Sequence, residues 1–479
     1  MLYATRYMLK FWNSLTRTRE PFYTIVPGEV RIYSCGPTVY QRAHIGNFRA
    51  YVVWDILKRT LKANGYKVIH CMNITDVGHL VSDGDSGEDK MIKTSRLTGK
   101  SAWDVAKEFE KIFIDDARRL NIELPEGKLL CRATDHIYEQ IKLVQILIDK
   151  GYAYKISDGI YFDTSKYPDY GKLSGQALEE KQEGARVEEN LEKKNPTDFA
   201  LWKFSYPYGR SFDPACDDVS LKRQMEWESP WGLGFPGWHV ECSAMSRKYL
   251  GQPFDIHTGG IDHIPVHHEN EIAQSVCAYG LPQANFWLHV NFLTVDGQKM
   301  SKSLKNNYDL DECQEHGIEP LDVRYFFLGA HYRSKENFTW QSAEGAHNAL
   351  TKLREIAREW DTPTEVDADW NAKFMAELED DMNTPAALGI MWDMIKSDLE
   401  SDRKAATLLS WDKILGLDLD EYIAKQIDIP ENVKAIAERR WQARNRQDWA
   451  EADQLRFELE DLGWLMEDRG ASYKLKLKK

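Results

Sequence analysis

The sequence lacks three features that are typical of secreted or membrane proteins: cysteines in paired spacing, a membrane span and a secretory signal. Its seven cysteines are scattered along 479 residues and are never spaced as Cys-x-x-Cys, which argues against a disulfide framework and fits a reducing compartment. No apolar run approaches the ~18 residues of a membrane span, and residues 1–7 lack the apolar centre of a signal peptide. We therefore expect a cytoplasmic protein that does not cross a membrane, with the interpretable pattern beginning at Met8.

An excess of positive charge is also missing. The formal net charge is −14, so the molecule as a whole repels polyanions, which argues against non-specific binding of nucleic acids. Residues 434–479 are the exception, because they hold 11 Lys and Arg against 9 Asp and Glu. A local region of this kind still allows an RNA partner.

The first half of the sequence alternates between strand and helix patterns. Strands are expected over 29–36 and 66–76, with a helix over 44–63 between them, and this order is typical of a parallel α/β sheet. A polar, glycine-rich loop is expected over 77–100. A helix over 137–148 is followed by a hairpin signal at Asp158-Gly159, which interrupts the α/β alternation. We therefore expect residues of about 125–205 to form an insertion between two halves of one Rossmann-type sheet.

The α/β pattern resumes near residue 254 and changes to helices after about 330. A chain of 479 residues with 42% hydrophobic residues is too long for one ordinary domain, so we expect it to fold into several domains. The stretch Ser205–Trp231 is long and polar and is expected to be a surface loop. The predicted domains are an α/β catalytic domain over 8–330, an all-α bundle over 331–419 and a small mixed α/β module over 420–479.

Two short segments have residue types suited to a polyphosphate. The first is His-Ile-Gly-Asn at the expected start of a helix, where His44 and Asn47 can donate hydrogen bonds and Gly46 allows close approach to the backbone. The second is Lys-Met-Ser-Lys-Ser, in which Lys299 and Lys302 follow a glycine turn. Alone, the first segment is more often an ordinary helix start and the second more often a solvated basic loop.

Four residues have side chains that suit a zinc ion. Cys35 ends the first expected strand, Cys242 lies in Pro-Gly-Trp-His-Val-Glu-Cys, and His267 and Glu271 share one face of a helix because they are four residues apart. Separately, each has a simpler interpretation, since cysteines are common in cores and His-x-x-x-Glu is more often a surface pair. Their positions favour a metal site, because each borders the sheet edge at which ligands gather in open α/β folds.

Several longer segments give the sequence a specific resemblance. "CGPTVYQRAHIGN", "NITD", "PGWHVECSAM", "FDIHTGGIDHIPVHHENEIAQS" and "KMSKS" occur in this order and together resemble the cysteinyl-tRNA synthetases, a family of class I aminoacyl-tRNA synthetases. The resemblance runs from about Met8 to the C-terminus. It includes a DALR-type helical bundle and, at "RWQARNRQDWAEADQLR", the anticodon-binding module of the family.

The resemblance implies roles for individual residues. The zinc ligands of the family fall at Cys35, Cys242, His267 and Glu271. Thr75 and Trp238 fall in the amino-acid pocket, Asp262 at the ATP ribose, and Lys302 at the phosphates. One departure is Asn47, because many class I enzymes have His there; Asn can donate a neutral hydrogen bond but cannot become cationic. His44 is therefore the stronger candidate for a catalytic role.

The expected activity is the ATP-dependent ligation of L-cysteine to tRNA(Cys) through a cysteinyl-adenylate. One Zn²⁺ per chain is expected to select the cysteine thiolate, Mg²⁺ is expected with ATP, and a monomer is favoured. Two alternatives are a cysteine ligase that acts on an amino-sugar and a zinc-stabilised RNA-binding protein without catalysis. Residues 430–479 argue against the first, and the two intact phosphate segments argue against the second.

Overall fold

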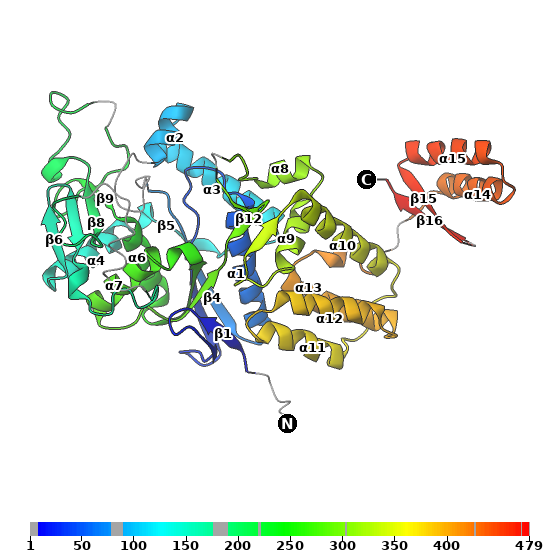
Figure 1. Cartoon of the computed structure of the whole chain (residues 1–479), viewed down its shortest axis with the longest axis horizontal. Coiled ribbons are helices and arrows are strands. Elements are labelled where there is room, and N and C mark those ends of the chain that lie inside the picture. Colours follow the sequence, from blue (N-terminus) through cyan, green and yellow to red (C-terminus); the bar gives the residue numbers. More distant parts are fainter. Residues whose placement is uncertain are drawn as a thin grey trace.

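The computed structural model describes residues 8–77, 90–175, 190–218, 222–301, 304–425, 428–470 and 472–478. Its parts follow one another along the longest axis in Figure 1: an antiparallel insertion, the parallel sheet, a helical bundle and a small C-terminal module. In the sequence, the first elements are β1 (Lys10–Asn13) and β2 (Thr18–Pro21), which form a two-stranded hairpin. Among the described helices, none combines the length and the apolar character needed to cross a membrane.

The central sheet has five parallel strands. They are β3 (Glu29–Ser34), β4 (Lys67–Ile74), β5 (Leu130–Arg132), β10 (Phe254–Gly260) and β11 (Ala284–Val290). Their order is β11-β10-β3-β4-β5, and every neighbouring pair is parallel. The expected parallel sheet in two halves is therefore confirmed. The halves meet where β3 pairs with β10, and a crevice opens beyond the carboxyl ends of strands at such a switch point.

Three helices beside the carboxyl ends of the parallel strands bring residues from the two halves of the sheet together. They are α1 (Ile45–Ala63), α6 (Trp238–Leu250) and α7 (His267–Tyr279). α1 begins with a capping box between His44 and Asn47, and α7 ends at Gly280, whose left-handed conformation suits a helix C-terminus. The expected helix starting at His44 is thus confirmed, with His44 as its N-cap.

The loop expected over 77–100 is wrong over residues 90–98. Residues 78–89 lie outside the described part of the chain, but α2 (Lys90–Thr98) is a helix that packs against α3 (Ala102–Arg119). The polar sequence of α2 conceals one narrow buried face, formed by Met91 and Ser95. Two positions four residues apart are too few to give a helical period in sequence, so tertiary packing decides this helix.

The insertion is an antiparallel sheet with one covering helix. Its elements are α4 (Ile137–Asp149), β6 (Ala153–Ile156), β7 (Gly159–Phe162), β8 (Phe199–Phe204) and β9 (Gly234–Pro236). The predicted hairpin is confirmed, because β6 and β7 pair around the Asp158-Gly159 turn. The chain passes from β9 directly into α6, so the insertion delivers Trp238 and Cys242 to the edge of the parallel sheet.

A small sheet connects the parallel sheet to the helical part. It consists of β12 (Leu293–Val295), β13 (Gln298–Lys299) and β14 (Glu336–Phe338), with α8 (Leu310–Glu315) and α9 (Pro320–Leu328) between β13 and β14. The bundle contains α10 (Trp340–Arg358), α11 (Ala368–Glu379), α12 (Thr384–Lys396) and α13 (Ser401–Leu415). The C-terminal module contains α14 (Glu431–Asn445), α15 (Trp449–Asp461), β15 (Trp464–Arg469) and β16 (Ser472–Leu477). The predicted order of α/β domain, helical bundle and mixed module is confirmed.

Candidate active site

A cavity of about 400 Å³ lies at the carboxyl edge of the parallel sheet. Its size is in the range of small-molecule sites, which span roughly 300–1,000 Å³. The sequence-predicted residues that line it are Cys35, His44, Gly46, Asn47, Thr75, Trp238, Cys242, Asp262, His267 and Lys299. Segments from both halves of the sheet therefore meet in one cavity.

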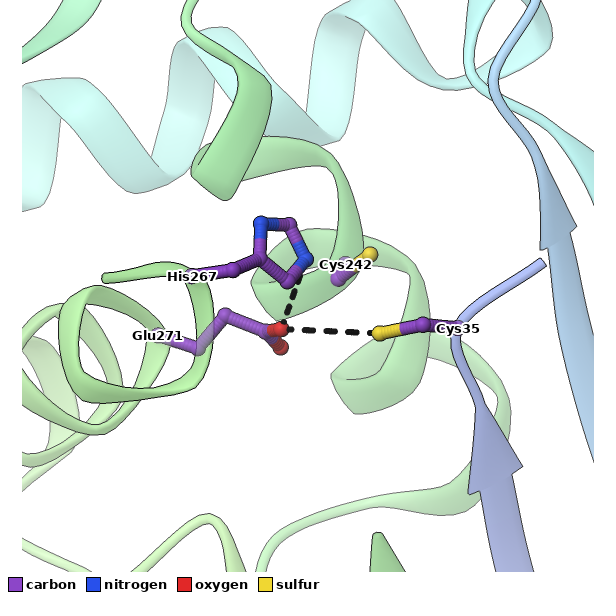
Figure 2. A group of neighbouring side chains, drawn as sticks. All are labelled: Cys35, Cys242, His267 and Glu271. Carbon is purple, nitrogen blue, oxygen red and sulfur yellow. Dashed lines mark hydrogen bonds and ion pairs between the residues drawn. The ribbon is translucent and has the colours of Figure 1, made fainter. Parts of the chain in front are cut away.

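The predicted metal residues converge at one end of this cavity. One donor atom from each of Cys35, Cys242, His267 and Glu271 lies within 4.8 Å of the others. Figure 2 shows the four side chains pointing toward one another from the end of β3, from α6 and from α7. Nε2 of His267 lies 3.0 Å from Oε1 of Glu271, and Sγ of Cys35 lies 3.9 Å from the same oxygen. All four residues are buried.

A second group of donors overlaps the first. Cys35 and Glu271 also lie within 4.8 Å of donor atoms of His257 and His268. Of this second group only Cys35 lines the cavity, whereas Cys35, Cys242 and His267 of the first group all line it. An ion that contacts a substrate has to face the cavity, so the first group is the better candidate for such an ion.

Charges in the cluster favour a bound cation. Burial raises the pKa of Cys35, but a hydrogen bond with Cys242 and the charges of His268 and His267 outweigh burial and hold this pKa well below its ordinary value. Burial also opposes protonation of His267, yet the charges of Glu271 and Cys35 raise its pKa to about 10. An anionic donor set that holds a proton this tightly is also suited to a metal cation.

Thr75 and Trp238 line the same cavity as the candidate metal residues. Oγ1 of Thr75 donates to the buried carboxylate of Glu241 at 2.9 Å and accepts from Asn73 at 3.0 Å. Trp238 is only partly buried, and its ring centroid lies 4.4 Å from that of His267. Trp238 also lines the cavity, which is the position that a role in the amino-acid pocket requires.

His44 and Asn47 are held by each other. The backbone N–H of Asn47 donates to Nδ1 of His44, and the backbone N–H of His44 donates to Oδ1 of Asn47. A neutral His44 then carries its proton on Nε2, and burial lowers its pKa, so the ring is a neutral donor. Gly46 lies so near the second segment that an added Cβ would stand 2.7 Å from Sδ of Met300.

The second phosphate segment is partly described. Lys299 is exposed at the end of β13 and lines the cavity with Met300. Lys302 lies outside the described residues. Asp262 follows Gly259 and Gly260 at the end of β10 and also lines the cavity.

Sequence reasoning missed the histidines behind the candidate metal residues. Nδ1 of His239 lies 3.0 Å from Nδ1 of His267, and Nε2 of His257 lies 3.0 Å from Oε2 of Glu271. His268 contacts Cys35 through Nε2 at 3.2 Å. The one signal in the sequence was the clustering of histidines, because the chain has 13 of them and several fall between residues 239 and 289. Which of them contact the ligands depends on the order of the strands.

Three family models match successive parts of the chain. The model described as "tRNA synthetases class I (C) catalytic domain" matches residues 21–348. The DALR domain model matches residues 373–420, and the model of the cysteinyl-tRNA ligase anticodon binding domain matches residues 427–473. The match at the C-terminus argues against the amino-sugar ligase considered above.

Curated relatives cover nearly the whole chain. A cysteine–tRNA ligase 1 of Burkholderia lata is 50% identical over 461 residues, which is 96% of this chain and 95% of the relative. A cysteine–tRNA ligase of Treponema denticola is 40% identical over 496 residues, which covers 96% of this chain and 98% of the relative. These relatives are ligases, which argues against a protein without catalysis.

Solved structures share the fold at low sequence identity. A methionyl-tRNA synthetase of Mycobacterium tuberculosis matches with a TM-score of 0.53 and 15% identity, covering 83% of this chain and 91% of its own. A leucyl-tRNA synthetase of Agrobacterium radiobacter matches with a TM-score of 0.56 and 13% identity, covering 85% of this chain and 87% of its own. These likenesses support the class I synthetase fold.

Proposed function

The chain belongs to the cysteinyl-tRNA synthetase family, whose reaction is the ATP-dependent joining of cysteine to tRNA, and we propose that zinc selects its amino acid. The proposed ligands are Cys35, Cys242, His267 and Glu271. The observation that carries the proposal is that their donor atoms converge within 4.8 Å at the wall of a cavity shared with both phosphate segments.

The donor set fits zinc in kind and in spacing. Zinc in proteins takes four ligands from Cys, His and carboxylates at roughly 2.0–2.3 Å, so tetrahedral ligand atoms stand about 3.3–3.8 Å apart. The distances of 3.0 Å and 3.9 Å from Oε1 of Glu271 are close to this range. Two sulfur donors also favour zinc over magnesium or calcium, which prefer oxygen.

Zinc would address the main selectivity problem, which is the exclusion of serine. An apolar pocket separates such near-isosteres by only ~1–3 kcal/mol, whereas a bond that the wrong substrate cannot make gives about 10⁴-fold discrimination or more. When bound, zinc favours a thiolate over a protonated hydroxyl. We propose that Thr75 and Trp238 complete the amino-acid pocket, with Trp238 excluding water beside His267.

We propose that the chain's phosphate segments act in the first step. The carboxylate of cysteine attacks the α-phosphorus of ATP, the bond to the bridging oxygen breaks, and pyrophosphate leaves with its electron pair, so that cysteinyl-adenylate forms. Negative charge grows on the leaving group, and donors placed around it lower the barrier. His44 through Nε2, Lys299 and Lys302 are the proposed donors, with Mg²⁺ accompanying ATP, while Asp262 holds the ribose.

The second step transfers the cysteinyl group. A hydroxyl of the 3′-terminal ribose of tRNA attacks the carbonyl carbon, and AMP leaves. We propose that the module over 420–479 binds the anticodon, which is supported by the match of residues 427–473 to an anticodon-binding model. We also propose a monomeric enzyme, because one chain supplies both phosphate segments and all four candidate ligands, and we propose a cytoplasmic location because the scattered cysteines fit a reducing compartment. Sedimentation of the purified protein would test the monomer.

The zinc proposal is tested by metal content and substrate selection together. We expect close to one zinc per chain in undialysed protein, and ATP–pyrophosphate exchange with cysteine but not with serine. Cys242→Ser should lose zinc and cysteine-dependent exchange together, because one sulfur donor is replaced by a hydroxyl that stays protonated. Metal analysis and exchange kinetics on the same samples give both readings.

Cys277→Ser is the matched control. Cys277 is also a buried cysteine and lies in α7, the helix of His267 and Glu271, but it belongs to neither donor group. It should keep zinc and exchange activity. If Cys242→Ser lost zinc and thermal stability but kept its affinity for cysteine, the zinc would be structural and the proposal would fail.

A further inference from the structure

Arg49 is a buried arginine of α1 whose two terminal guanidinium nitrogens, Nη1 and Nη2, each donate to two backbone carbonyls. Its side chain is 1% exposed, although an arginine has five N–H donors to satisfy. Four backbone carbonyls and one carboxylate surround it. The carbonyls belong to Asn291, Phe292, His331 and Ser334. The carboxylate is that of Glu336, whose Oε2 lies 2.8 Å from Nε.

The partners of Arg49 stand at the base of the small sheet. Residues 291–292 directly precede β12, and residues 331–334 precede β14, in which Glu336 is the first residue. β12 and β14 pair in parallel with Leu293 opposite Glu336. β12 then turns into β13, which ends at Lys299. One guanidinium therefore holds both strands whose sheet carries the second phosphate segment.

The same side chain belongs to the helix of the first phosphate segment. α1 begins at its N-cap His44, and five residues of helix span only about 7.5 Å, so Arg49 and His44 move as one rigid unit. The two segments also meet at the cavity, which Gly46 and Met300 both line, and beyond the second segment the backbone N–H of Ile45 donates to the carbonyl of Tyr308 at 2.9 Å. Arg49 itself lies behind the cavity wall, which is formed there by Asn291 and Phe292.

The shape of the arginine matters as well as its charge. Burial raises the pKa of Glu336 to about 8, although the charge and hydrogen bond of Arg49 oppose this shift. The carboxylate is thus a weak anchor by itself, and the four carbonyls are the larger part of the link. A lysine keeps the charge but presents its donors from one nitrogen, so it cannot reach carbonyls on both strands in the same geometry.

We propose that Arg49 is a positioning residue for adenylate formation. Its guanidinium sets the separation between the His44 end of α1 and the strand of Lys299, so that both segments reach the polyphosphate together. This inference rests on the roles proposed above for His44 and Lys299. It adds a residue that touches neither substrate and acts through the backbone segments it joins.

The test is the kinetics of ATP–pyrophosphate exchange with Arg49→Lys. We expect kcat to fall about 10- to 100-fold, because a displacement near 1 Å can cost 10²-fold in rate. The KM for cysteine should change less than about twofold, since Cys35, Thr75 and Cys242 lie on other segments. Zinc content should equal that of the wild type. A residue with a merely structural role would lower thermal stability without this split between kcat and KM.

Arg59→Lys is the matched control on the same helix. Arg59 is also buried and bonds a carboxylate and backbone carbonyls, but its partners are Asp55, Asn121 and Lys413, away from the small sheet. Its substitution should lower the melting temperature and leave kcat within about twofold of the wild type, because it moves neither phosphate segment.

A second variant keeps the proposal open to refutation if Arg49→Lys does not fold. Glu336→Ala removes the carboxyl group that lies beside Nε of Arg49, and we expect kcat to fall about two- to tenfold with an unchanged KM for cysteine. Wild-type kcat in either variant would overturn the proposal, as would a parallel rise in the KM for cysteine. Failure of the proposed function would be seen separately, as missing zinc or missing exchange in the wild type.

Discussion

At the scale of single residues, substitution of Trp238 distinguishes a role in binding cysteine from a role in core packing. Because its ring lines the cavity and lies against His267, Trp238→Phe should raise the KM for cysteine several-fold, through lost cover of the thiolate, with only a small fall in melting temperature. Steady-state exchange and thermal unfolding give the two readings. Trp411→Phe, in the core of the bundle and fully buried, should show the opposite. An unchanged KM with a lower melting temperature would make Trp238 a core residue.

His70 predicts how stability depends on pH. Burial, reinforced by the charges of Lys58 and Lys62, lowers the pKa of this histidine to about 3, whereas an unfolded histidine titrates near 6.5. Between these values the unfolded state binds the extra proton, so acidification below pH 6.5 removes stability by up to ~1.4 kcal/mol per pH unit. Stability is fully present above pH 6.5 and is lost progressively toward pH 3.

His70→Gln removes this titration and keeps a polar group near Ser34, which His70 contacts through Nε2 at 2.9 Å. As the pH falls from 7 to 5, the melting temperature of the wild type should therefore fall relative to that of the variant. Melting temperatures of both proteins across this range test the prediction, and the zinc ligands they share cancel in the comparison. Parallel curves for the two proteins would contradict it.

At the scale of elements, Gly416 terminates α13 where the bundle meets the α/β domain. It has φ +66°, and a Cβ there would stand 2.6 Å from Nη2 of the fully buried Arg324. Gly416→Ala should therefore cost ~1–2 kcal/mol for the left-handed backbone and about 1–3 kcal/mol more for overpacking. Calorimetric melting would show the loss.

Gly280→Ala isolates the first part of that cost, which is the strain of the left-handed backbone. Gly280 also ends a helix with positive φ, but a Cβ there would have nothing within 4 Å. Only the backbone cost should remain, so its melting temperature should fall less than that of Gly416→Ala. Equal falls would show that Arg324 yields to the added methyl group.

The elements themselves were predictable where their pattern is local. The helix beginning at His44 and the hairpin at Asp158-Gly159 were both expected and are present, because capping and turn residues act within a few positions. α2 was not expected, since its buried face has only Met91 and Ser95. Its stability comes from α3, which sequence patterns do not reveal.

At the scale of the whole molecule, the C-terminal module has its own apolar core and docks through charge. Val433, Leu455, Leu459 and Trp464 are among the residues that form this core. Lys476 pairs with Glu355 at 2.8 Å, and Lys474 pairs with Glu359, so β16 contacts the end of α10. We therefore expect that removing the module leaves the core of the bundle covered.

Truncation after Lys425 tests the anticodon role. This site keeps Ile423, which is buried, and Ala424, whose backbone N–H donates to the carbonyl of Ala357 at 3.0 Å. Cysteine-dependent exchange should persist, because the predicted zinc and ATP residues all precede this point. kcat/KM for charging tRNA should fall sharply, and the salt dependence of tRNA binding should flatten as phosphate contacts are lost.

Exchange activity serves as the internal control for folding of the truncated chain. Unchanged charging of tRNA alongside unchanged exchange would refute an anticodon role for the module. Loss of both activities together would mean that docking on α10 supports the α/β domain, and it would contradict the predicted independence of the two.

Local patterns in the sequence are enough to predict the fold class, the order of the parts and the residue types of the candidate site. Strand and helix periods, turn residues and short motifs act over a few positions, so they can be recognised in a linear chain. The four predicted metal residues and most predicted ATP residues line or border one cavity, and Lys302 lies outside the described residues.

The partners that surround those residues follow from the tertiary fold and could not be predicted from local patterns. His257 bonds Glu271 because β10 pairs with β3, and Arg49 bonds the base of the small sheet because α1 crosses it. These contacts join residues far apart in the chain, and they depend on strand order and helix packing. A local pattern contains no information about either, because the free energy that selects them comes from burial of the whole core.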